Sequence, residues 1–264
     1  MIHLLCEGVG IRAISRLTNL HQQTVLNILE SAGEKAQRFL EANVRNVKAE
    51  QVQADELVSF VYSKEQNTKP EDVERGSFFT YLSIDRASKL IINWRTAKRS
   101  KDDTDAFLTE LKNRVAGRFQ LTTDSWVGYC GYTGAVRRVF KGGIDYATEA
   151  KRYASSNPIF GIRFGRRQVV SVKRTTKIGN PDLRQATTSH CERTNLSVRI
   201  FNRRFTRLTL GYSKKLQNLR HAVALFVWHF NFVRIHSTHK ATPAQAAGLT
   251  TKALTIREFI ESAI

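Results

Sequence analysis

The sequence predicts an α/β protein in which a mixed sheet is flanked by helices and preceded by a small all-α module. Apolar residues follow a helical period over the first 40 residues and a strand-like alternation from about Val52. The order after Val52 is strand, strand, strand, helix, strand, which is typical of an α/β sheet. With 264 residues, 41% of them apolar and 25% charged, the chain can form one catalytic-sized core and a small accessory module.

The first helices fit a helix-turn-helix DNA-binding region over residues 1–48. Apolar residues recur at helical spacing from Ile11 to Leu17, a polar turn follows with Leu20 as its buried residue, and the period restarts at Val25. An ordinary helical hairpin would have the same period, so both interpretations stay open. In this register the exposed side of the second helix carries side chains able to bond base edges or phosphates: Gln22, Gln23, Thr24 and Asn27.

The strands of the core are predicted from runs of β-branched and aromatic residues. A helix with acids in its first turn follows them, from about Asp102 to Gly117, and a short fourth strand then ends in Asp124. This order is that of a ribonuclease H-like core. The first three strands are expected at residues 52–62, 78–85 and 90–94, with a hairpin turn at 85–88.

The second half of the chain is expected to be mostly helical. After a strand near residues 143–147, a basic stretch at about 151–188 lacks a regular period and is expected to be an insertion loop. Helices are predicted from about Ser189 to Phe205 and, apolar nearly all round, from about Ser213 to Val233. The ribonuclease H-like core is therefore expected at 49–248 and a C-terminal helical tail at 249–264.

Positive charge is concentrated in the last 114 residues. The net charge is +19, of which residues 151–264 contribute 21 basic minus 4 acidic side chains, or +17. Such asymmetry is typical of a surface that binds a polyanion, and nucleic acid is the commonest one. A membrane-surface helix would need its Lys and Arg gathered on one face of a long amphipathic segment, whereas here they are scattered.

Three cysteines, Cys6, Cys130 and Cys191, lie too far apart in sequence for a zinc pattern of the Cys-x-x-Cys kind and do not suggest a disulfide framework. No run reaches the ~20 apolar residues needed to cross a bilayer, and the first residues lack the features of a secretion signal. We therefore expect a cytoplasmic protein with no membrane partner.

Three acids stand where a two-metal phosphoryl-transfer site would need them. Asp55 interrupts the first strand, Asp124 ends the fourth, and Glu192 is one of two acids between Ala150 and Arg257. Carboxylates are the hard oxygen ligands that Mg²⁺ prefers. Each acid alone has a structural explanation, namely an edge-strand Asp, a turn-capping Asp and a Glu paired with an arginine. Their occurrence in this order favours a metal site.

Polar residues accompany Glu192 along one stripe of its predicted helix. Arg193, Asn195 and Arg199 share or flank that stripe and are candidates for holding phosphate beside the metals. Other acids have structural explanations: Asp85 lies in a hairpin turn, Asp145 lacks a matching context, and those at 102, 103 and 105 suit a helix dipole. Three histidines, His229, His236 and His239, lack a cysteine or acid to complete a metal cluster.

The three acidic motifs resemble those of DDE transposases of the insertion-sequence-one type. Val58 stands where relatives tend to have Trp, and His190-Cys191 replaces a more usual aromatic-aliphatic pair, but neither departure removes an acid. The likeness spans nearly the whole chain to Gly248. The motifs are Gln53-Ala-Asp-Glu-Leu-Val-Ser-Phe-Val, Leu121-Thr-Thr-Asp-Ser-Trp and Thr188-Ser-His-Cys-Glu-Arg-Thr-Asn-Leu-Ser-Val-Arg, followed by Arg203-Arg-Phe-Thr-Arg-Leu-Thr, Asn231-Phe-Val-Arg-Ile-His-Ser and Ala241-Thr-Pro-Ala-Gln-Ala-Ala-Gly.

This resemblance implies a transposase that cuts at the ends of an insertion sequence and joins the freed 3′-hydroxyls to target DNA. It implies two Mg²⁺ or Mn²⁺ ions held by Asp55, Asp124 and Glu192, one activating the nucleophile and one stabilising the leaving oxygen. Arg203 joins the expected DNA contacts. A homodimer or larger assembly on double-stranded DNA, associated with a bacterial nucleoid, is also implied. The alternatives are a non-catalytic helix-turn-helix protein, an inactive transposase remnant, or a ribonuclease H-type nuclease.

Overall fold

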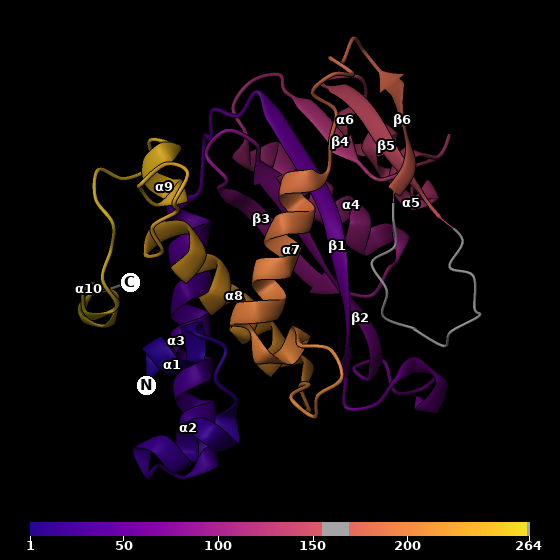
Figure 1. The fold of residues 1–264 in the computed structure, drawn as a ribbon. Helices are drawn as coiled ribbons and strands as arrows, with labels where there is room; N and C mark the ends of the chain where they lie inside the picture. Colours follow the sequence, from indigo (N-terminus) through magenta and orange to yellow (C-terminus); the bar gives the residue numbers. More distant parts are fainter. Residues whose placement is uncertain (155–168, 263–264) are drawn as a thin grey trace.

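The computed structural model describes residues 1–154 and 169–262. Within them one mixed sheet has the strand order β3-β2-β1-β4-β5-β6. The helix α7 lies across the face of β1, and α4 lies behind the sheet (Figure 1). The strands are β1 (Gln51–Val61), β2 (Gly76–Asp85), β3 (Ile91–Ala97), β4 (Gln120–Thr123), β5 (Asp145–Tyr153) and β6 (Val169–Ile178). The helices are α1 (Ile2–Cys6), α2 (Ile11–Thr18), α3 (Gln22–Asn43), α4 (Lys101–Arg114), α5 (Val127–Cys130), α6 (Ala135–Phe140), α7 (Ser189–Phe201), α8 (Leu216–Phe232), α9 (Pro243–Ala246) and α10 (Ile256–Glu261), with 3₁₀ turns η1 (Glu65–Asn67) and η3 (Arg203–Phe205).

The pairing of the strands agrees with the predicted ribonuclease H-like core. Antiparallel pairing joins β1 to β2 and β2 to β3, and parallel pairing joins β1 to β4 and β4 to β5. The expectation of an irregular insertion at about 151–188 is wrong in part. There β5 continues to Tyr153, and β6 pairs with it antiparallel as an added edge strand. Residues 155–168 of that insertion lie outside the described residues.

Side chains from neighbouring helices form hydrogen bonds with backbone N–H and C=O groups of β3. This strand is the edge of the sheet opposite to β6. Asn231 of α8 donates to the carbonyl of Ile91 at 2.8 Å and accepts from its N–H at 3.0 Å. Arg114 of α4 donates to another β3 carbonyl, and Arg220 of α8 to a third. Because an unpaired edge can add a foreign strand, these bonds protect the sheet from pairing with other chains.

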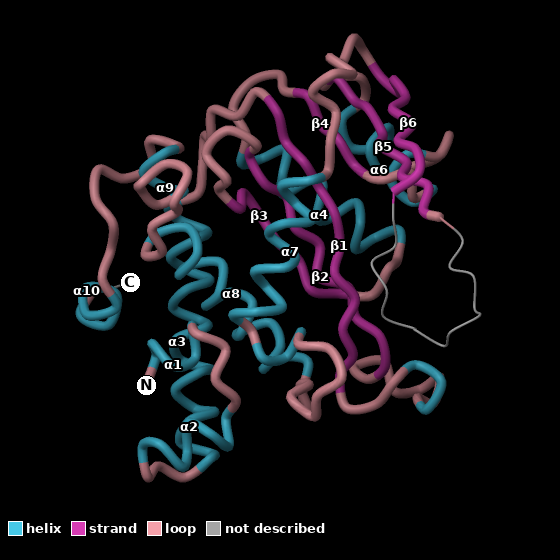
Figure 2. Tube along the Cα trace, in the orientation of Figure 1, coloured by secondary structure: helices cyan, strands magenta, loops and turns pink. Residues whose placement is uncertain are grey.

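The N-terminal helices differ in detail from the predicted helix-turn-helix. Ile14 and Val25 are buried, as the period requires, but Leu17 is 68% exposed and Leu20, the expected buried turn residue, is 37% exposed. The second helix, α3, runs on to Asn43 and lies beside α8 (Figure 2). The helix pair exists, and its use as a DNA-reading helix-turn-helix stays a prediction.

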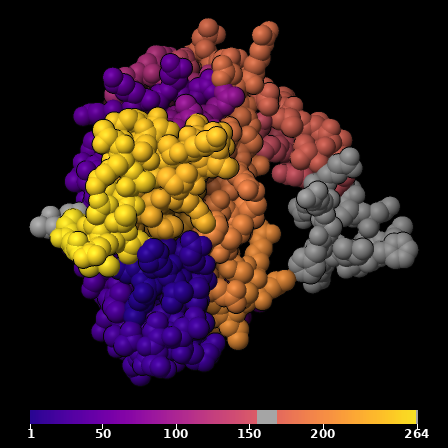
Figure 3. All heavy atoms as spheres, turned by 60° about the vertical axis from the view of Figure 1, so that its left-hand side comes forward, coloured from indigo at the N-terminus to yellow at the C-terminus, as the bar shows by residue number. Residues whose placement is uncertain are grey.

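The long apolar helix expected at 213–233 is α8, and most of its side chains are buried. Trp228 stacks on Phe259 of α10 with ring centroids 3.9 Å apart, so the predicted tail packs onto the core. Figure 3 shows this C-terminal segment against the N-terminal helices. None of the helices in the described residues has the length and apolar character needed to span a bilayer.

The helix expected from Ser189 to Phe205 ends earlier, at Phe201. Asn202 leaves the helical conformation, and its side chain donates to the carbonyl of Ala222 at 3.1 Å. The chain then forms η3 and a turn before α8 begins. Asn202 Oδ1 also accepts from the N–H of Arg204 at 3.3 Å, and this local cap of η3 competes with continuation of the helix.

Two histidines near the end of α8 should make the fold less stable in acid. Burial, with the charge of Arg234 beside both, lowers the pKa of His229 and of His236 to about 4. An unfolded histidine titrates near 6.5, so between about pH 6.5 and 4 the unfolded state binds more protons. Stability should therefore fall as pH falls through this window, by on the order of 1 kcal/mol per histidine after allowance for solvent screening.

Urea unfolding at pH 7 and pH 5 measures this effect. In a chain carrying both His229→Gln and His236→Gln the loss of stability between the two pH values should be smaller than in the wild type. An equal loss in both chains would contradict the assignment, whatever the absolute stabilities.

Candidate active site

The register between β1 and β4 brings two of the predicted acids side by side. Gln53 lies opposite Thr122 in this parallel pair. Continuing the register by two residues sets Asp55 opposite Asp124, which directly follows β4. Residues two apart share a face of a strand, and neighbouring strands are about 4.8 Å apart. The two carboxylates therefore lie close to each other at the end of β4.

The helix that carries Glu192, α7, is hydrogen-bonded to β1, the strand that carries Asp55. The side-chain oxygen of buried Gln53 accepts from the backbone N–H groups of His190 and Cys191, at 2.9 and 3.0 Å. Asn195, one turn further, donates from Nδ2 to Oδ2 of Asp55 at 2.7 Å. The first turns of α7, with Glu192 between these anchors, thus lie over Asp55.

Negative charge accumulates at this point. Burial raises the pKa of Asp55 to about 6, and the carboxylates of Asp124 and Glu192 add to the shift while Lys151 opposes it. Burial also raises the pKa of Glu56 to about 7, with Asp124 and Asp55 adding to the shift against Arg99. A group of carboxylates that destabilise one another in this way is a place where a bound cation is stabilising.

Glu192 has a cationic partner from the protein itself. Its carboxylate is 46% exposed, forms an ion pair with Lys151 of β5, and accepts from Thr188 Oγ1 at 2.8 Å. Lys151 also lies 3.4 Å from Glu149, a carboxylate with 2% exposure. Burial opposes ionisation of Glu149, but hydrogen bonds from Thr188 and the charges of Lys151 and Arg174 outweigh it and lower its pKa.

A second group of residues holds Asp124. The backbone N–H of Trp126 donates to Asp124 Oδ1 at 3.0 Å. The guanidinium of Arg99 lies 3.9 Å from the centroid of the Trp126 ring and forms an ion pair with Glu56. Glu56 faces the side of the sheet opposite Asp55, as the alternation of side chains along a strand predicts. Its ion pair with Arg99 holds the guanidinium that packs on the Trp126 ring.

The chemistry of the predicted donors fits a hard divalent cation. Three carboxylates from β1, the end of β4 and α7 face one region, and the buried Oδ1 of Asn195 beside Asp55 has no hydrogen-bond partner among the described residues. In the described part of the chain, however, no three His, Cys, Asp or Glu side chains converge closely enough to hold a metal ion. Lys151 occupies the carboxylate of Glu192 instead.

Several of these residues were missed by sequence reasoning. Glu149 and Lys151 lie two apart on β5 and therefore share a face, but their partners on α7 lie about 40 residues away along the chain. Arg99 and Trp126 carry no motif of their own. The one sequence signal for this second group was Glu56, the carboxylate directly after Asp55.

The predicted DNA contacts fall into two groups. Arg193 and Arg203 are exposed and Arg199 is half-buried along and just beyond α7, whereas Asn195 is buried and bonded to Asp55, so the expected phosphate contact by Asn195 does not match its position. The other group lies in the first turns of α3, away from the acids (Figure 1). Its members, Gln22, Gln23, Thr24 and Asn27, are all exposed.

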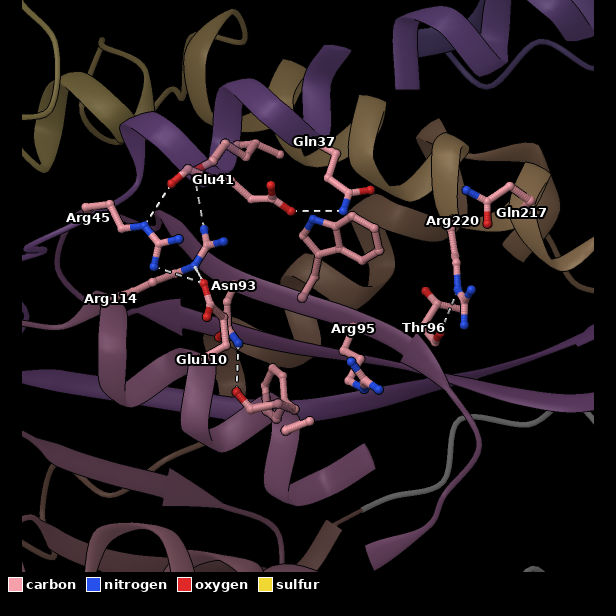
Figure 4. Close-up of a pocket in the computed structure, with 14 residues that line it drawn as sticks. Gln37, Glu41, Arg45, Asn93, Arg95, Thr96, Glu110, Arg114, Gln217 and Arg220 are labelled. Atoms are coloured by element: carbon pink, nitrogen blue, oxygen red, sulfur yellow. Dashed lines mark hydrogen bonds and ion pairs between the residues drawn. The ribbon is translucent and has the colours of Figure 1, made fainter. Parts of the chain in front are cut away.

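The remaining polar candidates have structural roles. Asp85 accepts from the N–H and Oγ of Ser88 in the β2–β3 turn, and Asp145 pairs with Arg118. A separate cavity of about 650 Å³ lies between α3, β3, α4 and α8 (Figure 4). Glu110 within it pairs with Arg45 and Arg114.

The fold and the site together define an α/β protein with a carboxylate-rich site between its sheet and a basic helix. No family model and no curated protein matches the chain. Among solved structures it is similar to a chain of a simian T-cell lymphotropic virus intasome in complex with the PP2A regulatory subunit B56 gamma, with 13% identity and a TM-score of 0.40 over 77% of this chain and 56% of that one. It is also similar to a piggyBac transposase synaptic complex with hairpin DNA, with 10% identity and a TM-score of 0.37 over 84% and 53%.

The chain thus spans little more than half the length of both of those chains. Similarities of this size leave its activity to be argued from its own residues.

Proposed function

We propose that this chain is a transposase of the insertion-sequence type, a metal-dependent polynucleotidyl transferase. The observation that carries the proposal is the attachment of α7 to β1 through Gln53 and Asn195, which brings Glu192 to the face where Asp55 and Asp124 lie side by side. These are the acids of the three motifs that resemble those of DDE transposases. They lie in the strand order of a ribonuclease H-like sheet.

Asp55, Asp124 and Glu192 would hold two Mg²⁺ or Mn²⁺ ions. Bound there, the ions would activate water or a 3′-hydroxyl for attack on a phosphodiester and stabilise the leaving oxygen. The protein's own contribution is orientation. Asn195 holds Asp55, and Trp126, packed under Arg99, holds the carboxylate of Asp124. Lys151 keeps Glu192 at the site as a counter-charge that must be released when a metal takes its place.

DNA would lie along α7 and the basic half of the chain. Arg193 and Arg203 are exposed there, and Arg199 is close enough to Asp55 for their charges to interact. The exposed polar residues of α3 would contact element ends. Pairing two ends of an element calls for a homodimer or larger assembly, and we propose a cytoplasmic, nucleoid-associated location.

Incubation with labelled element ends, Mg²⁺ and a target plasmid tests the proposal. Joined products are expected. Cleavage without joining would instead indicate a ribonuclease H-type nuclease, and a shifted but intact DNA a non-catalytic binder or inactive remnant.

Binding to DNA should depend steeply on salt. If the half with charge +17 contacts six or more phosphates, affinity should fall by about 10³-fold or more between 50 and 200 mM salt. Arg193→Gln should weaken binding and reduce the salt slope by about 1. Arg257→Gln, on α10 and already paired with Glu261, is the matched control and should leave the slope unchanged. Fluorescence anisotropy over a salt series measures both, and a flat response would contradict the proposed surface.

A further inference from the structure

The turn between α7 and α8 holds two leucines out in solvent. Leu208 and Leu210 are 87% and 90% exposed, more than any other large aliphatic side chain among the described residues. Leu208 also has a φ of 56°, in the left-handed region that a leucine rarely adopts. Scattered exposed apolar residues are common, but two at the tip of one turn indicate a surface that contacts something else.

This turn is anchored at both ends, so the leucines project from a fixed base. Thr206 Oγ1 donates to the carbonyl of Arg199 at 3.0 Å and ties the turn to α7. Arg204 Nε donates to Ser213 Oγ at 2.9 Å across the turn. The carbonyl of Ser213 accepts from the N–H of Tyr62 at 2.9 Å, which ties the turn to the end of β1. A strained backbone conformation such as that of Leu208 persists where contacts of the surrounding structure hold it in place, as these hydrogen bonds do.

The segment of chain that carries the leucines is basic and contains no acid. Residues 193–215 contain no Asp or Glu. None of their basic side chains takes part in an ion pair within the described part of the chain. These side chains are Arg193, Arg199, Arg203, Arg204, Arg207, Lys214 and Lys215.

Charge decides what this surface can contact. Two copies of the chain that met through it would bring unpaired cations together, which opposes association. A polyanion neutralises them. Apolar side chains flanked by Arg and Lys are the combination with which proteins grip duplex DNA and insert between its base steps. The turn also continues α7, which carries Glu192, so DNA at the acidic site would reach it.

We propose that Leu208 and Leu210 form a wedge that enters duplex DNA and unstacks a base step while the neighbouring Arg and Lys hold its phosphates. This rests on the proposed function in that the chain must bind DNA. It requires neither metal nor cleavage, so the two proposals can fail separately.

The test uses short duplexes that carry 2-aminopurine at successive positions, whose fluorescence rises when the base unstacks. In EDTA the wild-type chain should raise the fluorescence at one or two adjacent positions by about twofold or more. A chain with Leu208→Ser and Leu210→Ser should bind the duplex with an unchanged salt slope but without the rise. Val73→Ser is the matched control: Val73 is 73% exposed, but it lies between acids and should have no effect.

A second readout is preference for a mismatched duplex, in which unstacking is easier. The wild type should prefer it over the intact duplex, and the double variant should lose about fivefold or more of that preference. The wedge is wrong if the wild type binds without unstacking, if it fails to bind DNA, or if the double variant unstacks DNA normally. It is also wrong if the double variant changes only the oligomeric state in sedimentation. Unstacking without any strand joining in Mg²⁺ would refute the transposase alone.

Discussion

Asp124→Asn is expected to abolish strand cleavage and joining while the protein stays folded and bound to DNA. The amide keeps an oxygen that can accept the Trp126 N–H bond, now 3.0 Å long, so the turn after β4 should survive. The substitution removes a negative charge and a metal ligand from the site. We expect the rate of strand transfer, measured from labelled products on a gel, to fall by about 10³-fold or more.

Asp55→Asn should have the same effect on activity and also raise stability. Because the pKa of Asp55 in the folded chain is about 6, above the unfolded value, its contribution to stability is present in acid and is lost as pH rises through 6. At pH 8 the neutral amide of Asn avoids that loss. Urea unfolding should therefore give a free energy of unfolding about 1–2 kcal/mol higher for Asp55→Asn than for the wild type.

The matched control for both substitutions is Asp102→Asn. Asp102 is an exposed acid in the first turn of α4, and its loss should leave strand transfer unchanged. If Asp124→Asn or Asp55→Asn retained full strand-transfer activity, that carboxylate would not be a metal ligand and the proposed metal site would be wrong. If either variant unfolded, the loss of activity would have no bearing on the chemistry, so the unfolding curve is measured with every assay.

Gly33→Ala should destabilise the protein strongly, although alanine is the better helix former. In a helix interior alanine is more favourable than glycine by about 0.5–1 kcal/mol. In α3, however, a β-carbon on Gly33 would lie 2.6 Å from Cα and 2.8 Å from the carbonyl oxygen of His221 in α8. These are backbone atoms, so the two helices would have to separate. We expect a loss of about 1–3 kcal/mol or more, as for overpacked cores.

Ser31→Ala separates the two effects. Ser31 is an exposed residue of the same helix, so its substitution reports helix propensity alone and should be neutral or slightly stabilising. Urea denaturation of both variants gives the comparison. Equal stability of Gly33→Ala and Ser31→Ala would mean that α3 and α8 do not pack as closely as described.

Local patterns were sufficient to predict the first strands of the sheet and two of its acids. Alternating apolar residues located β1 and β2 within two residues of their ends, and Asp55 was recognised as an acid within a strand. The end of β4 was located in the same way, so Asp124 was expected at the sheet edge. Strand length, turn residues and period are local properties, and for that reason they survive folding.

Predictions that depended on partners distant in sequence were less accurate. Leu17 matches a helical period and Leu20 was expected as the buried residue of the turn, but both are exposed. The strand β6 was missed: its residues include β-branched Val169, Val170 and Val172, but they show no regular alternation of apolar and polar side chains. Glu192 was expected to bind metal, and the alternative paired it with an arginine nearby in sequence; its ion-pair partner is Lys151 from another strand.

The sequence by itself determined the kind of side chains that could meet, the strand order that could bring them together and the charge of the surface around them. Only the tertiary structure decided that Asn195 bonds to Asp55, that Lys151 pairs with Glu192, and that Arg99 packs on the ring of Trp126 in the turn after β4. The physical reason is that periodicity reports which face of an element is buried, whereas the partner of a polar side chain depends on the register and orientation of elements packed from elsewhere in the chain.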